Sequence, residues 1–124
     1  MSENIKSKNK VKGNLGENVV NQYLEQYQYE VLCRNFKCSF GEIDIVFKDK
    51  DELVFAEIKT RTGIEYGFPA ESVTELKKKH IVNTAKYFLY KTNMTKCNVR
   101  FDVIEVYLIN NKKPYINHIK NVFW

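Results

Sequence analysis

Two apolar runs that each carry an acidic residue constrain the possible folds of this chain more than any other feature of its sequence. They lie in Gly41–Arg61, GEIDIVFKDKDELVFAEIKTR, on either side of a short charged turn. Asp44 and Glu57 stand where a plain core strand would hold another aliphatic residue. Lys59 follows Glu57 by two residues, so on a strand the two side chains would share one face, about 6–7 Å apart. If the two runs pair as a hairpin, Asp44 can reach them.

The length of 124 residues is enough for one domain with its own core. Residues 1–12 are polar and alternate lysine with other residues, which indicates a flexible basic tail followed by a single domain over 13–124. The tail lysines are either simply solvated or a phosphate-binding arm. The formal net charge of +5 favours a polyanionic partner, with nucleic acid first.

The cysteine pattern and the hydropathy exclude several classes of protein. Cys33, Cys38 and Cys97 form no CxxC pair, which argues against a disulfide framework and against a zinc site. We expect a cytoplasmic protein, because no apolar N-terminal run resembles a secretory signal. No stretch approaches about 20 apolar residues, so we expect no association with a membrane.

The apolar patterns of the whole chain, including the two runs above, predict two helices and five strands. Helical spacing runs over 13–27 and again over 73–92, where Ser72–Glu75 reads as a capping box and Asn93 as a stop. Alternating or continuous apolar runs predict strands over residues 29–35, 43–48, 53–60, 98–109 and 115–120.

The order of these elements predicts an α/β fold with a mixed central sheet flanked by helices. Strand 53–60 is apolar on both faces, which is typical of a central strand covered by helices. Leu53, Phe55, Glu57 and Lys59 would share one of its faces. The helix between strands 53–60 and 98–109 should make them parallel neighbours, with a right-handed crossover.

Acids and a lysine on one sheet face predict a metal site next to a phosphate. Asp44 and Glu57 would supply two ligands to Mg²⁺, and the backbone carbonyl of Ile58 a third, with water completing the shell. Lys59 would orient or deprotonate the attacking water, and Arg61 would hold a phosphate. The bare spacing is common by chance, and the alternative is a structural ion pair between Glu57 and Lys59.

Other polar residues leave two interpretations open. Glu17 is either the second half of a capping box with Asn14 or an extra carboxylate near the metal. Asp102 is more simply an ion-pair partner of Arg100 than a site residue. Isolated histidines are interpreted as surface or core-rim residues. In the basic run 77–80 we assign a phosphate contact to Lys77, while Lys78 and Lys79 also fit a solvated helix face.

The chain resembles the YraN-like family of the PD-(D/E)xK restriction-endonuclease-like superfamily. The segments that carry this resemblance cover residues 13–107 in order: Gly16-Glu17, Arg34-Asn35, Gly41–Val46, Phe55–Arg61, Tyr66–Pro69, Val73-Thr74 with Lys77, and Arg100–Val103. The resemblance implies an αβββαβ core and a nuclease site at Asp44, Glu57 and Lys59. The layout is also similar to that of archaeal Holliday-junction resolvases, which implies that Glu17 joins the metal ligands.

These observations lead to the hypothesis of an endonuclease that uses Mg²⁺ or Mn²⁺. The expected partner is DNA rather than RNA, in branched or single-stranded form, and a homodimer would suit a symmetric junction. Asp44, Glu57, Ile58 and Glu17 would hold the metal. The nucleic-acid contacts would come from Arg61, Lys77, Arg34 and Lys78. The alternatives are a non-catalytic nucleic-acid-binding protein with the same fold and a purely structural or protein-interaction domain.

Overall fold

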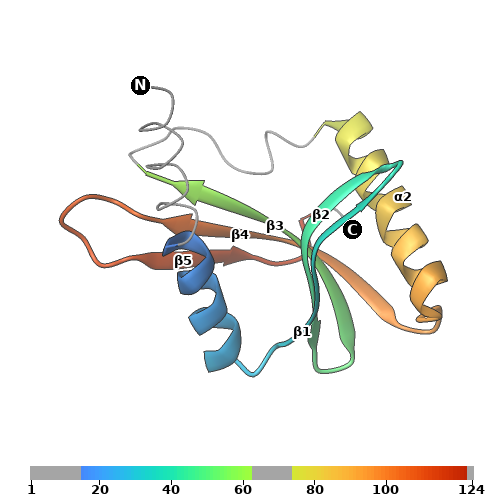
Figure 1. The fold of residues 1–124 in the computed structure, drawn as a ribbon, viewed down its shortest axis with the longest axis horizontal. Coiled ribbons are helices and arrows are strands. Elements are labelled where there is room, and N and C mark those ends of the chain that lie inside the picture. Colours follow the sequence, from blue (N-terminus) through green and yellow to red (C-terminus); the bar gives the residue numbers. More distant parts are fainter. Residues whose placement is uncertain (1–14, 63–73, 123–124) are drawn as a thin grey trace.

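The fold is a five-stranded mixed sheet with helices packed on both faces. A computed structural model describes residues 15–62 and 74–122 (Figure 1). A first helix occupies residues 15–26, and the other elements are β1 (Glu30–Cys38), β2 (Gly41–Asp49), β3 (Glu52–Arg61), α2 (Glu75–Thr92), β4 (Asn98–Tyr107) and β5 (Tyr115–Ile119). No helix in these two ranges is long and apolar enough to cross a membrane.

The strands lie side by side in the order in which they occur in the chain, β1-β2-β3-β4-β5. β1 with β2, β2 with β3, and β4 with β5 are antiparallel, whereas β3 and β4 are parallel and are joined through α2. The predicted mixed α/β sheet and the central position of β3 are therefore confirmed, and β5 lies at one edge. The element order is that of the αβββαβ core of restriction-endonuclease-like proteins.

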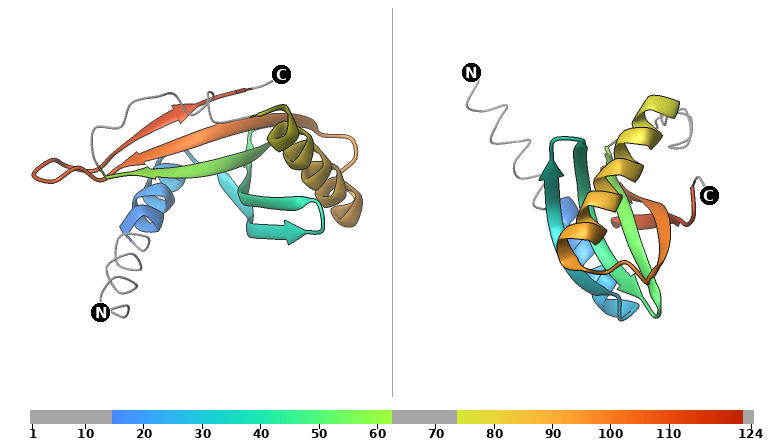
Figure 2. Two further views of the ribbon diagram at one scale, coloured as in Figure 1. Left: turned by 90° about the horizontal axis from the view of Figure 1, so that it is seen from above. Right: turned by 90° about the vertical axis from the view of Figure 1, so that its right-hand side faces the viewer.

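Alternation along β3 distributes its side chains between two hydrophobic cores. Val54 and Ala56 pack with Val20 and Leu24 of the first helix. Leu53 and Phe55 pack with a second set that includes Ala85 and Phe88 of α2. The two helices therefore cover opposite faces of the sheet, and Figure 2 shows them well apart from each other. Glu57 lies two residues after Phe55 and so points to the same face of β3, as predicted, which is the face covered by α2.

Several predicted boundaries differ from those observed. β1 continues to Cys38, three residues beyond the prediction, because it stays paired with β2 as far as Gly41. The N-cap of α2 is Thr74, whose side chain accepts a hydrogen bond from the Lys77 N–H. The predicted cap Ser72, the residue Asn14 and the tail 1–12 lie outside the described residues. Asn93 ends α2 in a left-handed conformation, as predicted.

The pairing between β2 and β3 ends at the two acidic residues, Asp44 and Glu57. The last pair of the two strands is Ile45 with Ala56, so Asp44 and Glu57 are the first residues beyond the ladder. β2 also turns here, because Ile45 packs on the first-helix face while Ile43, two residues away, packs on the α2 face. The outer half of the β1–β2 hairpin reaches α2, as Figure 1 shows. This divergence opens the sheet at the candidate site.

Candidate functional site

Asp44 occupies the gap between the diverging strands. Its Oδ2 accepts a hydrogen bond of 2.8 Å from the backbone N–H of Ile58, a group that β2 would otherwise have bonded. Burial raises the pKa of Asp44, and the hydrogen bond from Ile58 offsets this only in part, because the charges of Glu57 and Glu42 raise it further. The carboxylate is therefore held in a place where its negative charge is disfavoured.

Ile58 contributes a second polar group to the same gap. In a β-strand the N–H and C=O of one residue point to the same side of the chain. Since the N–H of Ile58 faces Asp44, its carbonyl points toward that side as well. The structure thus brings Asp44 next to Ile58, the pair that sequence analysis assigned to a metal.

Glu57 receives two lysines. Its Oε1 lies 3.3 Å from the Lys59 Nζ and 3.1 Å from the Lys77 Nζ, which comes from α2. The side chains of Glu57 and Lys59 are about one-quarter exposed, at 25% and 26%. The predicted proximity of Glu57 and Lys59 on one strand is confirmed, and α2 adds a cation to the same oxygen.

A cavity of about 200 Å³ lies on the α2 face of the site. Asp44, Glu57, Lys77 and Glu42 provide its ionisable groups, and it also borders Asp102, whose side chain is fully buried. Its other lining residues are mainly apolar: Ile43, Phe55, Ala56, Ile81, Phe101 and Val103. An apolar lining with few charged groups strengthens every electrostatic interaction inside it.

A second cavity, of about 320 Å³, lies on the other face of the sheet and shares Asp44 with the first. Glu17 and Arg34 line it, along with Ile58. Glu17 is exposed on the first helix and does not border the cavity that contains Glu57. Of the predicted residues, Glu57 and Lys77 border the cavity on one side of Asp44, and Glu17, Arg34 and Ile58 border the cavity on the other.

The donor set fits a hard divalent cation with a large share of water ligands. In residues 15–62 and 74–122, no group of three or more His, Cys, Asp or Glu side chains is placed to hold a metal ion. Mg²⁺ commonly binds proteins through only one or two carboxylates and keeps several waters. Asp44 and Glu57, with a backbone carbonyl nearby, match that requirement and do not match a zinc site.

Two of the predicted nucleic-acid contacts lie away from both cavities. The Nε of Arg61 is bonded to Glu105 Oε2 at 3.3 Å. The Nζ of Lys78 is 3.4 Å from Glu75 on the same helix. Glu105 is only 3% exposed and was missed by sequence analysis, although it stands as an acid inside an apolar strand, the same signal that marked Asp44.

Asp102 belongs to a buried polar network. Its carboxylate accepts from Arg100, from His118 Nε2 at 2.6 Å and from the backbone N–H of Asn121. Burial alone would raise the pKa of Asp102, but the hydrogen bonds from His118 and Arg100 outweigh it and lower the pKa. The predicted ion pair with Arg100 is confirmed.

His118 is a residue of intermediate exposure, which fits the predicted core-rim position, but it takes part in a polar network that was not predicted. Its side chain is only 4% exposed, and its Nδ1 lies 2.7 Å from the hydroxyl of Tyr23. Burial is the main reason that the pKa of Tyr23 rises to about 12. This chain of bonds ties the first helix, which carries Glu17, to β4 and β5.

Comparison with known proteins gives one family for this arrangement. Residues 16–106 match the model of the "Uncharacterised protein family UPF0102". The chain belongs to the UPF0102 family. A UPF0102 protein of Clostridioides difficile is 44% identical over 115 residues, which cover 93% of this chain and 98% of the relative. Those of Clostridium kluyveri and Caldicellulosiruptor saccharolyticus are 45% and 42% identical, covering 93% and 90% of this chain and 95% of each relative.

The UPF0102 match includes every residue that lines either cavity. It begins at Gly16, beside Glu17, and continues beyond Glu105. It ends before β5, so His118 lies outside it. The predicted YraN-like membership is thereby confirmed, and the fold is compatible with a nuclease.

Proposed function

We propose that this UPF0102 protein is a metal-dependent endonuclease that hydrolyses phosphodiester bonds in DNA. One observation carries the proposal: Asp44 and Glu57 border one cavity where β2 and β3 part, and two lysines reach Glu57 there. Hydrolysis of a phosphodiester requires a placed water and neutralisation of the charge that develops on the phosphoryl oxygens. Paired acids with adjacent cations supply both.

Asp44, Glu57 and the Ile58 carbonyl would hold Mg²⁺ or Mn²⁺, with Glu17 approaching from the second cavity. When bound, such an ion activates water and polarises a phosphoryl oxygen. The raised pKa of Asp44 supports the assignment, because a partly buried carboxylate next to Glu57 gains most from a cation.

The lysines have a separate task in this proposal. Lys59 and Lys77 share one oxygen of Glu57, at 3.3 and 3.1 Å. A phosphate entering the cavity would compete with Glu57 for the two ammonium groups, so each can turn toward it without leaving the site. Lys59, on the same strand as Glu57, is then placed to orient the attacking water, and Lys77 to neutralise the phosphate.

The decisive experiment offers duplex, single-stranded, flapped and four-way DNA, and RNA, with Mg²⁺, Mn²⁺ or EDTA. We expect metal-dependent cleavage of DNA that falls by at least about 100-fold in Asp44→Asn and Lys59→Met. Asp51→Asn, in the exposed turn before β3, is the matched control and should cleave as the wild type does. Activity that persists in Asp44→Asn would mean that the cleavage comes from elsewhere.

A second candidate is a nucleic-acid-binding protein without catalysis. The observation in its favour is that Glu57 already has two cationic partners, so its charge is compensated within the chain. This candidate predicts DNA binding that weakens with salt, without turnover of any substrate in the panel.

The expected homodimer is tested separately, by analytical ultracentrifugation of the same samples.

A further inference from the structure

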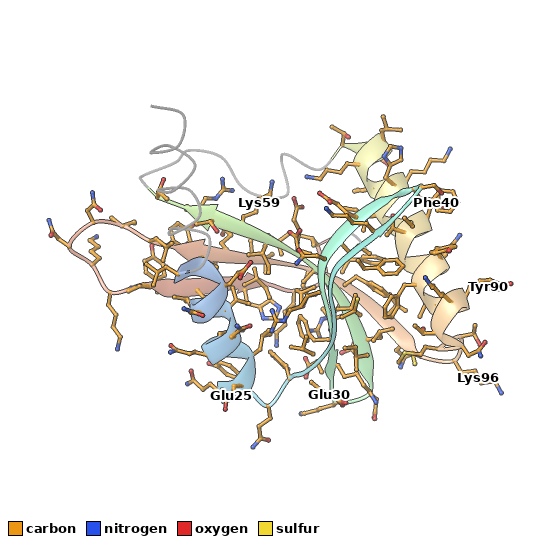
Figure 3. All side chains as sticks on the ribbon, viewed as in Figure 1. Glu25, Glu30, Phe40, Lys59, Tyr90 and Lys96 are labelled. Carbon is orange, nitrogen blue, oxygen red and sulfur yellow. The ribbon has the colours of Figure 1, made fainter. Side chains whose placement is uncertain are left out.

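Three large aromatic side chains are exposed along α2: two lie where the β1–β2 hairpin meets the helix, and the third follows three residues later on the helix. Phe40 is 47% exposed at the turn of the hairpin, and Tyr87 and Tyr90 on α2 are 38% and 77% exposed. The rings of Phe40 and Tyr87 have their centres 6.4 Å apart. Figure 3 shows Phe40 beside α2 and Tyr90 projecting away from the helix. Single exposed aromatics are ordinary, but a group of them marks a binding surface.

Exposed lysines accompany the two tyrosines along α2. Lys86 and Lys91 are exposed on the same part of α2, and Lys37 is exposed near the turn of the hairpin. We call Phe40, Tyr87, Tyr90, Lys86 and Lys91 the aromatic–lysine surface. A ligand that suits it needs flat apolar faces together with negative charge.

This surface shares α2 with Lys77 of the candidate site. Lys77, His80, Tyr87 and Lys91 follow each other at intervals of three, seven and four residues, which places them along one flank of α2. That flank faces the hairpin, because a Cβ on Gly41 would lie 3.2 Å from Thr84 Oγ1 and 3.7 Å from the Cβ of His80. Lys77, which is bonded to Glu57, and Tyr87 therefore lie on the same flank of α2, with the turn of the hairpin packed against the helix between them.

The distance along α2 from Lys77 to Tyr87 sets a scale for the ligand. Ten residues separate Lys77 from Tyr87, which is about 15 Å along an α-helix at about 1.5 Å per residue. A DNA strand with B-form spacing rises about 3.4 Å per nucleotide, so this distance corresponds to about four to five nucleotides. A single strand with one phosphate at the site would thus reach the rings within a few nucleotides.

We propose that the aromatic–lysine surface binds unpaired bases of a DNA strand about four to five nucleotides from the phosphate that occupies the site. The position of that phosphate rests on the proposed function. Bases stack on exposed aromatic rings irrespective of sequence, while lysines track the backbone. In a duplex the faces of the bases are already stacked on each other, so the surface selects single-stranded or branched DNA.

The charge of the surface argues against a second copy of this chain as its occupant. A symmetric interface would bring Lys86 and Lys91 of one copy against the same patch of another, and like charges in contact disfavour association. The net charge of +5 adds to that repulsion and favours a polyanion.

Binding is measured by fluorescence anisotropy with the full-length chain in EDTA, which separates binding from cleavage. The probes are a labelled single-stranded 20-mer and the corresponding duplex. We expect Tyr87→Ala and Tyr90→Ala each to weaken single-strand binding about 10-fold, as loss of one stacked base predicts, while duplex binding stays within about 2-fold. Tyr87→Phe keeps the ring and should bind as the wild type does.

Tyr27→Ala is the matched control, because Tyr27 is 56% exposed but follows the first helix on the other face of the sheet. Since Tyr90 is the most exposed of the three rings, its replacement leaves the fold intact, and unchanged melting curves verify this. Unchanged single-strand affinity in Tyr87→Ala and Tyr90→Ala overturns the proposal. So does an equal loss for duplex DNA, or a change in sedimentation mass without a change in affinity.

The binding experiment can fail or succeed independently of the test of the proposed nuclease activity. Ring-dependent single-strand binding by a protein that cleaves nothing would refute the nuclease and keep the aromatic–lysine surface. Metal-dependent cleavage that is indifferent to Tyr87 and Tyr90 would do the reverse.

Discussion

Replacing Asp102 and Asp44 by asparagine should change the free energy of unfolding in opposite directions. Both are partly or fully buried acids, and both lie in apolar strands. The environment of Asp102 lowers the pKa of its carboxyl, whereas that of Asp44 raises it. The charged form of Asp102 therefore stabilises the fold, and the charged form of Asp44 destabilises it.

The magnitude for Asp102→Asn follows from its contacts. The Asp102 side chain is 0% exposed and faces Arg100, whose side chain is 8% exposed. Breaking a buried ion pair by removing one partner costs about 3–5 kcal/mol. Arg100 keeps Asp49 at 2.9 Å and Glu52 at 3.1 Å, so we expect the lower end, about 3 kcal/mol. For a chain of this size that lowers Tm by roughly 10 °C.

Asp44→Asn should increase the free energy of unfolding, whereas Asp102→Asn should decrease it. A folded-state pKa above the unfolded value means that the acid contributes stability at low pH and loses it as the pH rises through that pKa. Above the folded pKa of Asp44 its charged form costs stability, so a neutral isostere should stabilise the protein there. The amide oxygen of asparagine can still accept the hydrogen bond from Ile58, which keeps the local backbone satisfied.

Urea unfolding at pH 7 in EDTA, followed by far-UV circular dichroism, measures both effects. The exposed Asp51→Asn variant sets the baseline for removal of one negative charge. A cost below about 1 kcal/mol for Asp102→Asn, or a clear loss of stability in Asp44→Asn, would refute the reasoning. Adding Mg²⁺ extends the test, because it should raise Tm in the wild type but not in Asp44→Asn.

Three further predictions concern single residues. On acidification the stabilisation by Asp102 should persist above its ordinary pKa of about 3.8 and disappear as the pH falls through the lower folded value, so acid unfolding followed by circular dichroism should occur at higher pH in Asp102→Asn. Gly41→Ala should cost more than about 1 kcal/mol in urea unfolding, because Gly41 has φ +154° and an added Cβ would lie 3.2 Å from Thr84 Oγ1. Lys77→Met should change stability by less than about 1 kcal/mol, because the pair with Glu57 is partly exposed, yet it should reduce the salt dependence of DNA binding.

Local pattern was sufficient to predict the centre of the site. Alternation along β3 placed Glu57 and Lys59 on one face, and the hairpin spacing placed Asp44 near them. These relationships depend on residues that are close in sequence and on the two-residue period of a strand. The boundary of β1 was less predictable, because its last residues are strand only through their pairing with β2.

Contacts between distant segments were not predictable in the same way. Arg61 pairs with Glu105 because β3 and β4 align Lys59 with Glu105 in a parallel register that α2 sets. The burial of His118 depends on the pairing of β5 with β4 and on Tyr23 from the first helix. The alignment of β4 with β3 or with β5 cannot be predicted from the periodicity of one strand. The sequence around an isolated histidine or arginine therefore does not indicate its partner.

The candidate site arises from an interruption of the sheet, which explains why a hydrogen-bond acceptor is needed there even before any ligand is considered. When β2 leaves β3 after Ile45, the Ile58 N–H loses the strand that would have bonded it, and an unsatisfied buried N–H is costly. Asp44 satisfies it through one oxygen, which fixes the orientation of the carboxylate. A neutral acceptor would satisfy the N–H equally well and avoid the burial of charge. We expect the proposed metal ion to bind at this carboxylate, because its pKa stays raised although the charge of Lys59 lowers it.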